Sequence, residues 1–91
     1  MLIDDVKLTL RISNTAYDTE IQDLIDSAKS DLELCGVKNI NEEDVLIKRC
    51  IITYVKANFG WDNPDSEKLN MSYEMLRNHL TYSLEYTEEG E

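Results

Sequence analysis

The segment over residues 45–59 constrains the fold most, because apolar side chains occur on nearly every side of it. Its 15 residues exceed the usual length of a strand, so the β-branched residues within it do not outweigh a helical interpretation. Its apolar members are Val45, Leu46, Ile47, Cys50, Ile51, Ile52, Tyr54, Val55, Ala57 and Phe59. A helix with so little polar surface is usually contacted on several sides. We therefore expect a central helix.

Two further segments have the apolar spacing of amphipathic helices, with steps of three and four residues. The first stripe consists of Ile21, Leu24, Ile25, Ala28, Leu32 and Cys35, followed by Gly36 as a suitable stop. The second consists of Leu69, Tyr73, Leu76, Leu80 and Leu84. We expect helices over 21–35, 45–59 and 69–84, with Thr15, Asn41 and Asn63 as their N-caps.

The first twelve residues fit either a strand or a helix. Apolar and polar side chains alternate from Val6 to Ile12, as in a strand. A lone strand would have no sheet to join, and Asp4 and Asp5 suit the first turn of a helix, so we expect a short helix from Asp4 to Arg11. The predicted fold is all-α, a small bundle of about four helices. Residues 1–84 form one helical domain, and residues 85–91 form a flexible acidic tail.

The length of the chain limits its core. A domain of 91 residues buries only about 60–65% of the surface of its unfolded chain, and such domains often gain stability from disulfides, metals or partner subunits. Cys35 and Cys50, with a single histidine and no CxxC motif, indicate neither a disulfide scaffold nor a zinc site. Partner subunits therefore remain as the source of additional stability. With no signal peptide and no long apolar run, we expect a soluble intracellular protein with reduced thiols and no membrane contact.

The charge balance is strongly acidic, with 19 acidic and 9 basic side chains and a formal net charge of −10. This charge opposes broad neutralisation of phosphates and therefore argues against a nucleic-acid reader. Two interpretations remain open: a surface that merely keeps the protein soluble, or one that lies near nucleic acid without binding it.

The sequence offers no convincing catalytic group. His79 lies within a helical pattern and is expected at the surface or at a subunit edge. Cys50 lies on the apolar run and is expected to be buried and inert. The acidic segment 62–67 lacks the glycine and glutamate positions of a calcium-binding loop. We therefore predict no enzymatic activity, no metal and no cofactor.

A second set of large side chains lies beside the core stripe of the last helix. It consists of Met71, Met75, Tyr82 and Tyr86. Either these residues widen the core face, or they contact another subunit, since Met and Tyr suit contact surfaces. Trp61 is a further interface candidate, or it packs against the start of the last helix.

The order of these features resembles the head-tail connector proteins of tailed bacteriophages, over about residues 4–83. The resemblance rests on VKLTLRI, YDTEIQDLIDSAKSDLELCGV, IKRCIITYVKANFGW and YEMLRNHL. Within these segments the family's opening pattern is matched by Leu10-Arg11-Ile12, Asp18, Glu20, Leu24-Ile25 and Ala28, and its aromatic third-helix end by Tyr54 and Phe59-Gly60-Trp61.

The resemblance implies a phage or prophage structural protein that acts in DNA packaging and virion assembly. It implies an oligomeric ring below the portal protein that extends the channel for double-stranded DNA and docks tail-completion proteins. The location would be the head-tail junction of the virion, and the host cytoplasm during assembly. The alternative is a small acidic regulatory protein that mimics DNA and sequesters a basic partner.

Overall fold

The computed structural model describes residues 2–38, 40–60 and 63–87. The regular secondary structure in this part of the chain is entirely helical, which confirms the all-α prediction. Four principal helices are followed by a single helical turn. They are α1 (Leu2–Leu10), α2 (Asp18–Leu34), α3 (Val45–Asn58), α4 (Ser66–Thr81) and α5 (Leu84–Thr87). The short helix α5 covers the start of the predicted tail, and residues 88–91 lie outside the described ranges.

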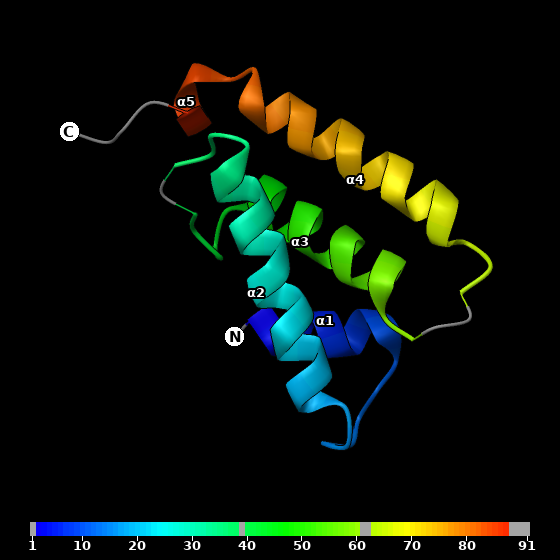
Figure 1. Ribbon diagram of the computed structural model, residues 1–91. Coiled ribbons are helices and arrows are strands. Elements are labelled where there is room, and N and C mark those ends of the chain that lie inside the picture. Colours follow the sequence, from blue (N-terminus) through cyan, green and yellow to red (C-terminus); the bar gives the residue numbers. More distant parts are fainter. Residues whose placement is uncertain (1, 39, 61–62, 88–91) are drawn as a thin grey trace.

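Helix α3 occupies the centre of the bundle, as its apolar sequence predicts (Figure 1). Helix α4 packs antiparallel along α3, α2 crosses α3, and α1 lies across the lower ends of α2 and α3 (Figure 1). Helix α5 packs against the end of α4. None of the helices in the described ranges has the length and apolar character needed to cross a bilayer.

The core forms where the predicted stripes meet. All four principal helices and the turn after α2 contribute side chains that are almost fully buried. Among the described residues, none of the buried ones is polar or charged. The core cluster is Leu2, Val6, Ile21, Ile25, Ala28, Leu32, Val37, Ile47, Cys50, Ile51, Val55, Tyr73 and Leu80.

The end of α2 corrects the predicted position of Cys35, which is exposed rather than part of the core stripe. Gly36 has a φ of 103°, a left-handed conformation that glycine adopts without a Cβ clash. The turn that follows is hydrogen-bonded from the Val37 amide to the Leu32 carbonyl and from the Gly36 amide to the Glu33 carbonyl, the Schellman arrangement. This turn brings Val37 into the core in place of Cys35.

The predicted N-caps were wrong because Thr15, Asn41 and Asn63 form turns before the helices. Asn41 accepts a hydrogen bond from the amide of Glu43, and Asp44 instead caps α3 by accepting from the amides of Leu46 and Ile47. Asx side chains form both structures by the same chemistry, so sequence spacing does not distinguish them.

The two other predicted caps, Thr15 and Asn63, also lie before the N-cap positions of their helices, which are occupied by Tyr17 and Asp65. The Thr15 carbonyl accepts from the amide of Asp18, and the Asn63 side chain accepts from the amide of Asp65. Helices α2 and α4 begin without a side-chain N-cap hydrogen bond. Helix boundaries therefore differ from the predicted ones by up to three residues, while each predicted principal helix is present.

Candidate functional site

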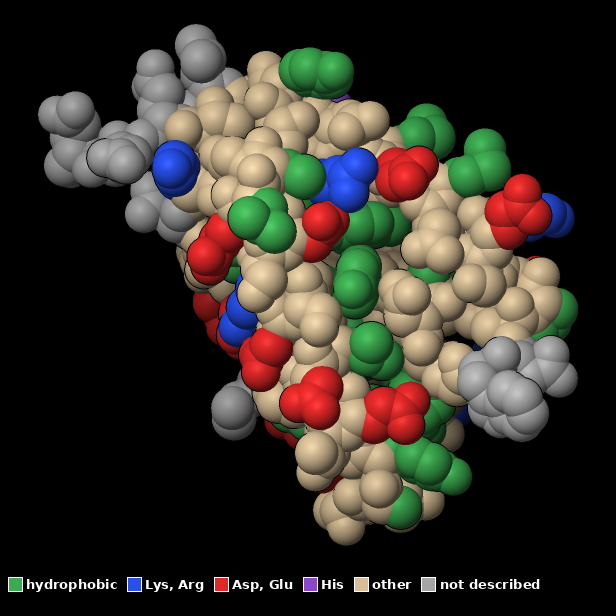
Figure 2. Space-filling view, viewed as in Figure 1, with side chains coloured by type: hydrophobic (Ala, Val, Ile, Leu, Met, Phe, Trp, Pro, Cys, Tyr) green, Lys and Arg blue, Asp and Glu red, His purple; other side chains and the backbone are tan. Residues whose placement is uncertain are grey.

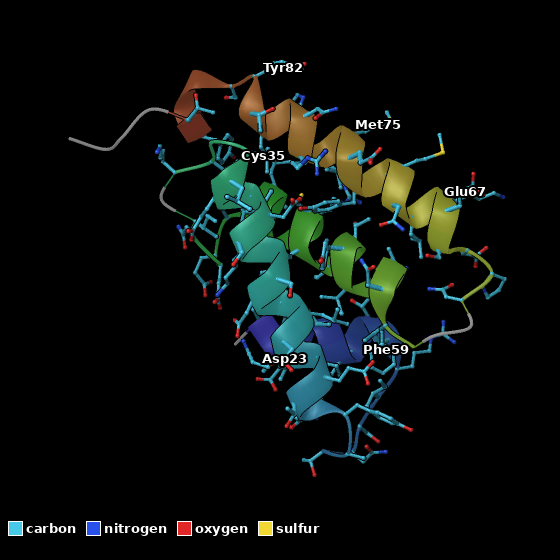
Figure 3. All side chains as sticks on the ribbon, in the orientation of Figure 1. Asp23, Cys35, Phe59, Glu67, Met75 and Tyr82 are labelled. Carbon is cyan, nitrogen blue, oxygen red and sulfur yellow. The ribbon has the colours of Figure 1, made fainter. Side chains whose placement is uncertain are left out.

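The outer side of α4 is apolar although it faces solvent. Met71, Met75 and Tyr82 are 60%, 72% and 87% exposed, and their spacing places them on one face of the helical path. Figure 3 shows Met75 and Tyr82 on the side of α4 that points away from α2 and α3. Because α4 buries only Tyr73 and Leu80 almost completely, these three residues are not needed to widen the core. We call them the α4 stripe.

Tyr86 does not belong to this exposed surface. It is half-buried against the core, and its hydroxyl donates to the carboxylate of Asp44 at 3.0 and 3.2 Å. Its carbonyl accepts from the amide of Lys38 at 2.6 Å. Tyr86 therefore attaches α5 to the segment before α3. Trp61, the remaining interface candidate, lies outside the described residues.

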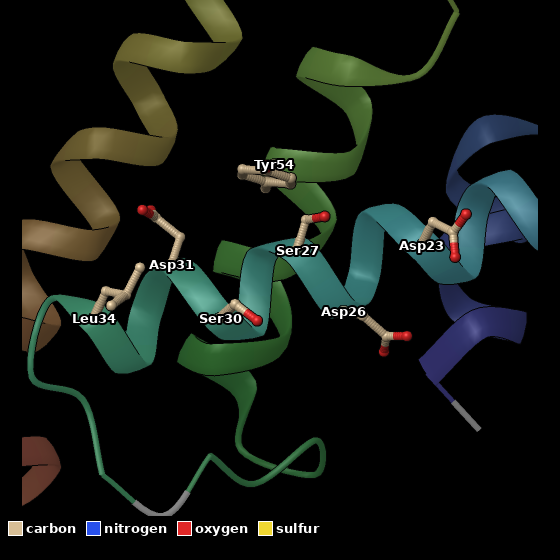
Figure 4. Close-up of a pocket in the computed structure, with 7 residues that line it drawn as sticks. All are labelled: Asp23, Asp26, Ser27, Ser30, Asp31, Leu34 and Tyr54. Atoms are coloured by element: carbon tan, nitrogen blue, oxygen red, sulfur yellow. The ribbon is translucent and has the colours of Figure 1, made fainter.

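A groove of about 550 Å³ runs along α2, with Tyr54 of α3 at its side (Figure 4). Figure 2 shows acidic side chains gathered over α2 and apolar ones in the depression beside it. We call this surface the acidic groove; it is lined by Asp23, Asp26, Ser27, Ser30, Asp31, Leu34 and Tyr54. The predicted core stripe of α2 contains none of these side chains, but the sequence did not predict that they border a groove.

Asp31 joins α2 to α4 at the edge of the acidic groove. Its Oδ2 accepts hydrogen bonds from the Tyr73 hydroxyl at 2.5 Å and from Arg77 Nη1 at 2.9 Å. Partial burial raises the pKa of Asp31, but the hydrogen bonds from Tyr73 and Arg77 favour the carboxylate and leave the pKa below its ordinary value. Burial, then the hydrogen bond to the charged Asp31, raises the pKa of Tyr73. Asp31 is thus a structural anion.

Aromatic contacts hold the same region. The rings of Tyr54 and Tyr73 meet edge-to-face with centroids 5.0 Å apart, and the Arg77 guanidinium lies 5.5 Å from the centroid of Tyr73. The hydrogen bond to Asp31 raises the pKa of Arg77, which therefore stays charged. This network fixes α4 against α2 and α3, so the groove is a preformed surface.

A second surface lies on α3 and carries the opposite charge. It forms an open depression of about 630 Å³, which is lined by Thr9, Val45, Lys48, Arg49, Ile52, Thr53 and Lys56. We call it the basic patch. Lys48 Nζ lies 3.1 Å from Asp5 Oδ2 on α1, whereas Arg49 and Lys56 have no carboxylate partner among the described residues.

The basic patch lies on the side of α3 that its neighbouring helices leave uncovered. Val45 is 74% exposed, and the polar side chains of α3 follow it at the spacing of one helical face. That signal is present in the sequence at positions 45, 48, 49, 52 and 56. The apolar residues of the segment predict a central helix, but they give no information about this basic face.

The structure contains no arrangement typical of catalysis at the residues considered for it. His79 is exposed on α4. Cys50 is buried, and burial raises the pKa of its thiol to about 12, so the reactive thiolate is scarce at neutral pH. Within the described ranges, no group of His, Cys, Asp and Glu side chains has the geometry to hold a metal ion.

Comparison with known proteins gives one finding that covers nearly the whole chain. A family model described as "Phage connector protein" matches residues 2–87. Searches of the curated proteins and of the solved structures each gave no significant match. The matched range includes all five helices and both charged surfaces.

Proposed function

The chain belongs to the phage connector protein family, and on that premise we propose that it is a non-enzymatic head-tail connector of a phage or prophage. In this role several copies form a ring below the portal protein at the head-tail junction of the virion. The ring extends the DNA channel and presents a docking face for tail-completion proteins. The family match over residues 2–87 carries this proposal.

Two properties of the subunit support the proposal. The formal charge of −10 would let double-stranded DNA pass without adhering, because carboxylates and phosphates repel one another. The α4 stripe is an apolar surface on a small domain, and Met and Tyr are suited to protein contacts. We propose that Met71, Met75 and Tyr82 contact a neighbouring subunit, the portal or a tail component; Trp61 stays an interface candidate from the sequence, whereas the contacts of Tyr86 within the subunit argue against such a role.

The test measures ring formation by the full chain, alone and with a portal ring, by native mass spectrometry and negative-stain imaging. Met75→Glu and Tyr82→Glu should each reduce assembly, because each places a charge in an apolar contact. Leu8→Glu is the matched control, since Leu8 is 78% exposed on α1, away from the α4 stripe. Circular dichroism should show that all three variants remain helical.

The outcomes distinguish the connector role from the assignment of the α4 stripe as a contact surface. If wild-type protein forms no ring either alone or on a portal, the connector proposal is wrong. If it forms rings and both glutamate variants assemble like Leu8→Glu, the connector role stands and the α4 stripe contacts neither a neighbouring subunit nor the portal. An acidic DNA mimic would instead compete with DNA for a basic partner, with a strong dependence on salt.

A further inference from the structure

We propose that neighbouring copies of this chain bind each other through the acidic groove of one copy and the basic patch of the next. This inference rests on the proposed ring assembly and names the two surfaces that would form the subunit contact. It leaves the α4 stripe for the component above or below the ring.

The two surfaces lie on opposite sides of α3. Tyr54 borders the acidic groove, and Ile52 and Lys56 line the basic patch. Each of these two residues is two positions from Tyr54, which corresponds to a rotation of about 200° around an α-helix. A closed ring of identical subunits with head-to-tail contacts requires two different, complementary surfaces on each copy. The position of the groove and the patch meets this requirement.

The charges available on the two surfaces are complementary and largely unpaired within the subunit. Asp23 and Asp26 are exposed and form no ion pair with a described residue. Arg49 is exposed and Lys56 is half-exposed, and both are equally without a carboxylate partner in the described ranges. Copies with a net charge of −10 repel one another, so a stable contact needs local pairing of opposite charges.

Both surfaces also expose apolar area next to these charges. Leu34 is 87% exposed at the end of the acidic groove, and Val45 is 74% exposed on the basic patch. Tyr54 and Ile52 add half-buried apolar surface on the two sides. A standard interface takes about 800 Å² from each partner, so one contact on each side would cover about a quarter of the 6256 Å² surface of the subunit.

A second copy fits the basic patch better than DNA does. The patch offers only three basic side chains, and one of them, Lys48, is already paired with Asp5. Binding of DNA would have to overcome the net negative charge of the whole subunit. The acidic groove on the opposite side of α3 supplies carboxylates in a surface that every neighbouring copy carries.

Charge reversal on one surface at a time tests the proposal. The first variant carries Arg49→Glu and Lys56→Glu, and the second carries Asp23→Lys and Asp26→Lys. Each alone should associate at least about tenfold more weakly than wild type, because like charges then face each other. Sedimentation equilibrium and imaging on a portal ring measure the association.

Mixing the two variants provides the matched control. The reversed patch of the first variant complements the reversed groove of the second, and the unchanged surfaces complement each other as well. An equimolar mixture also has, on average, the wild-type charge of −10 per chain. The mixture should therefore regain wild-type association with alternating subunits. If each variant assembles normally alone, or if the mixture stays dissociated, the assignment of the two surfaces is overturned.

Carbodiimide cross-linking of a mixture of isotope-labelled and unlabelled wild-type chains detects the proposed contact even when the association is too weak to measure by sedimentation. Links from Lys56 to Asp23 or Asp26 should join a labelled chain to an unlabelled one. The Lys7–Asp18 pair, 2.7 Å apart within one subunit, should link within single chains and serves as the control.

The cross-links distinguish the present inference from the connector role. Rings on a portal without the mixed links would overturn the surface assignment and leave the connector role intact. Mixed links without any ring would support the contact and overturn the connector role. Loss of DNA binding by the patch variant with normal assembly would show that the patch contacts DNA and would also overturn the inference.

Discussion

The hydrogen bond from Tyr73 to Asp31 gives a prediction whose size follows from the structure. Replacing Tyr73 with Phe removes the hydroxyl and keeps the ring, which is 3% exposed. A hydrogen bond to a charged group contributes about 1.5–3 kcal/mol. The Asp31 side chain is 34% exposed and still accepts from Arg77, so solvent screening favours the lower limit. We expect Tyr73→Phe to lower the free energy of unfolding by about 1.5 kcal/mol at neutral pH, or the melting temperature by about 6–12 °C.

The pH dependence gives this prediction a sign. Because folding lowers the pKa of Asp31, the stabilisation is fully present above the ordinary pKa of about 4 and is lost as the pH falls through the lowered folded-state pKa. The difference between wild type and Tyr73→Phe should therefore be largest at neutral pH and should shrink at an acidic pH below about 4, as the carboxyl group becomes protonated. Urea unfolding of both proteins at the two pH values measures it.

Tyr54→Phe is the matched control for this experiment. The Tyr54 ring contacts Tyr73 at 5.0 Å, but its hydroxyl has no hydrogen-bond partner among the described residues. Its loss should change the free energy of unfolding by less than about 0.5 kcal/mol. An equal cost for the two substitutions, or a cost of Tyr73→Phe that does not fall as the pH is lowered below about 4, would refute the assigned role of Asp31.

Three further outcomes follow from the packing. Native protein should react with a thiol reagent only at Cys35, and denatured protein also at Cys50, because Cys50 is buried with a pKa of about 12. Tyr86→Phe removes the hydrogen bond to Asp44 and should lower the free energy of unfolding, measured with denaturant, by about 1 kcal/mol. Tyr82→Phe should leave the free energy of unfolding unchanged. Ile51→Ala should cost about 3 kcal/mol in the same assay, since Ile51 is completely buried in α3.

The sequence predicted the helices because each one has to bury an apolar stripe. Ile21, Ile25 and Leu32 define α2 by spacing alone, and all three are almost fully buried. The N-terminal alternation also resolved to a helix, α1, in which Leu2 and Val6 are buried while Leu8 faces solvent. The boundaries were less predictable, because Asn side chains such as those of Asn41 and Asn63 form turns and caps by the same chemistry.

The candidate surfaces were predictable only in part. The second stripe made Met71, Met75 and Tyr82 interface candidates, but their spacing left open whether they widen the core, and only the structure shows that they are exposed. Tyr86 has the same spacing in the sequence, but the chain turns between α4 and α5 and directs it toward Asp44. Periodicity extends only as far as one continuous helix, so it gives no information beyond such a turn.

The acidic groove and the basic patch depend on how separate helices are arranged. The groove combines α2 side chains with Tyr54 of α3, and the patch combines α3 side chains with Thr9 of α1. The stripe of each helix fixes which side faces the core, but not which neighbour lies beside its remaining faces. The crossing of α2 over α3 and the position of α1 supply this information (Figure 1).

The net charge and the opposite surfaces make different contributions to assembly. At about 0.1 M salt the Debye length is about 10 Å, whereas the subunit measures 40 × 26 × 18 Å. Charges on neighbouring copies that lie farther apart than this length are therefore mostly screened, while charges that approach within it still repel or attract one another. Free copies with a charge of −10 resist random association, yet a copy that presents Arg49 and Lys56 to a neighbour's Asp23 and Asp26 gains a local attraction. The surplus of acid thus favours an ordered head-to-tail contact over disordered aggregation, because only one relative orientation brings these opposite charges together.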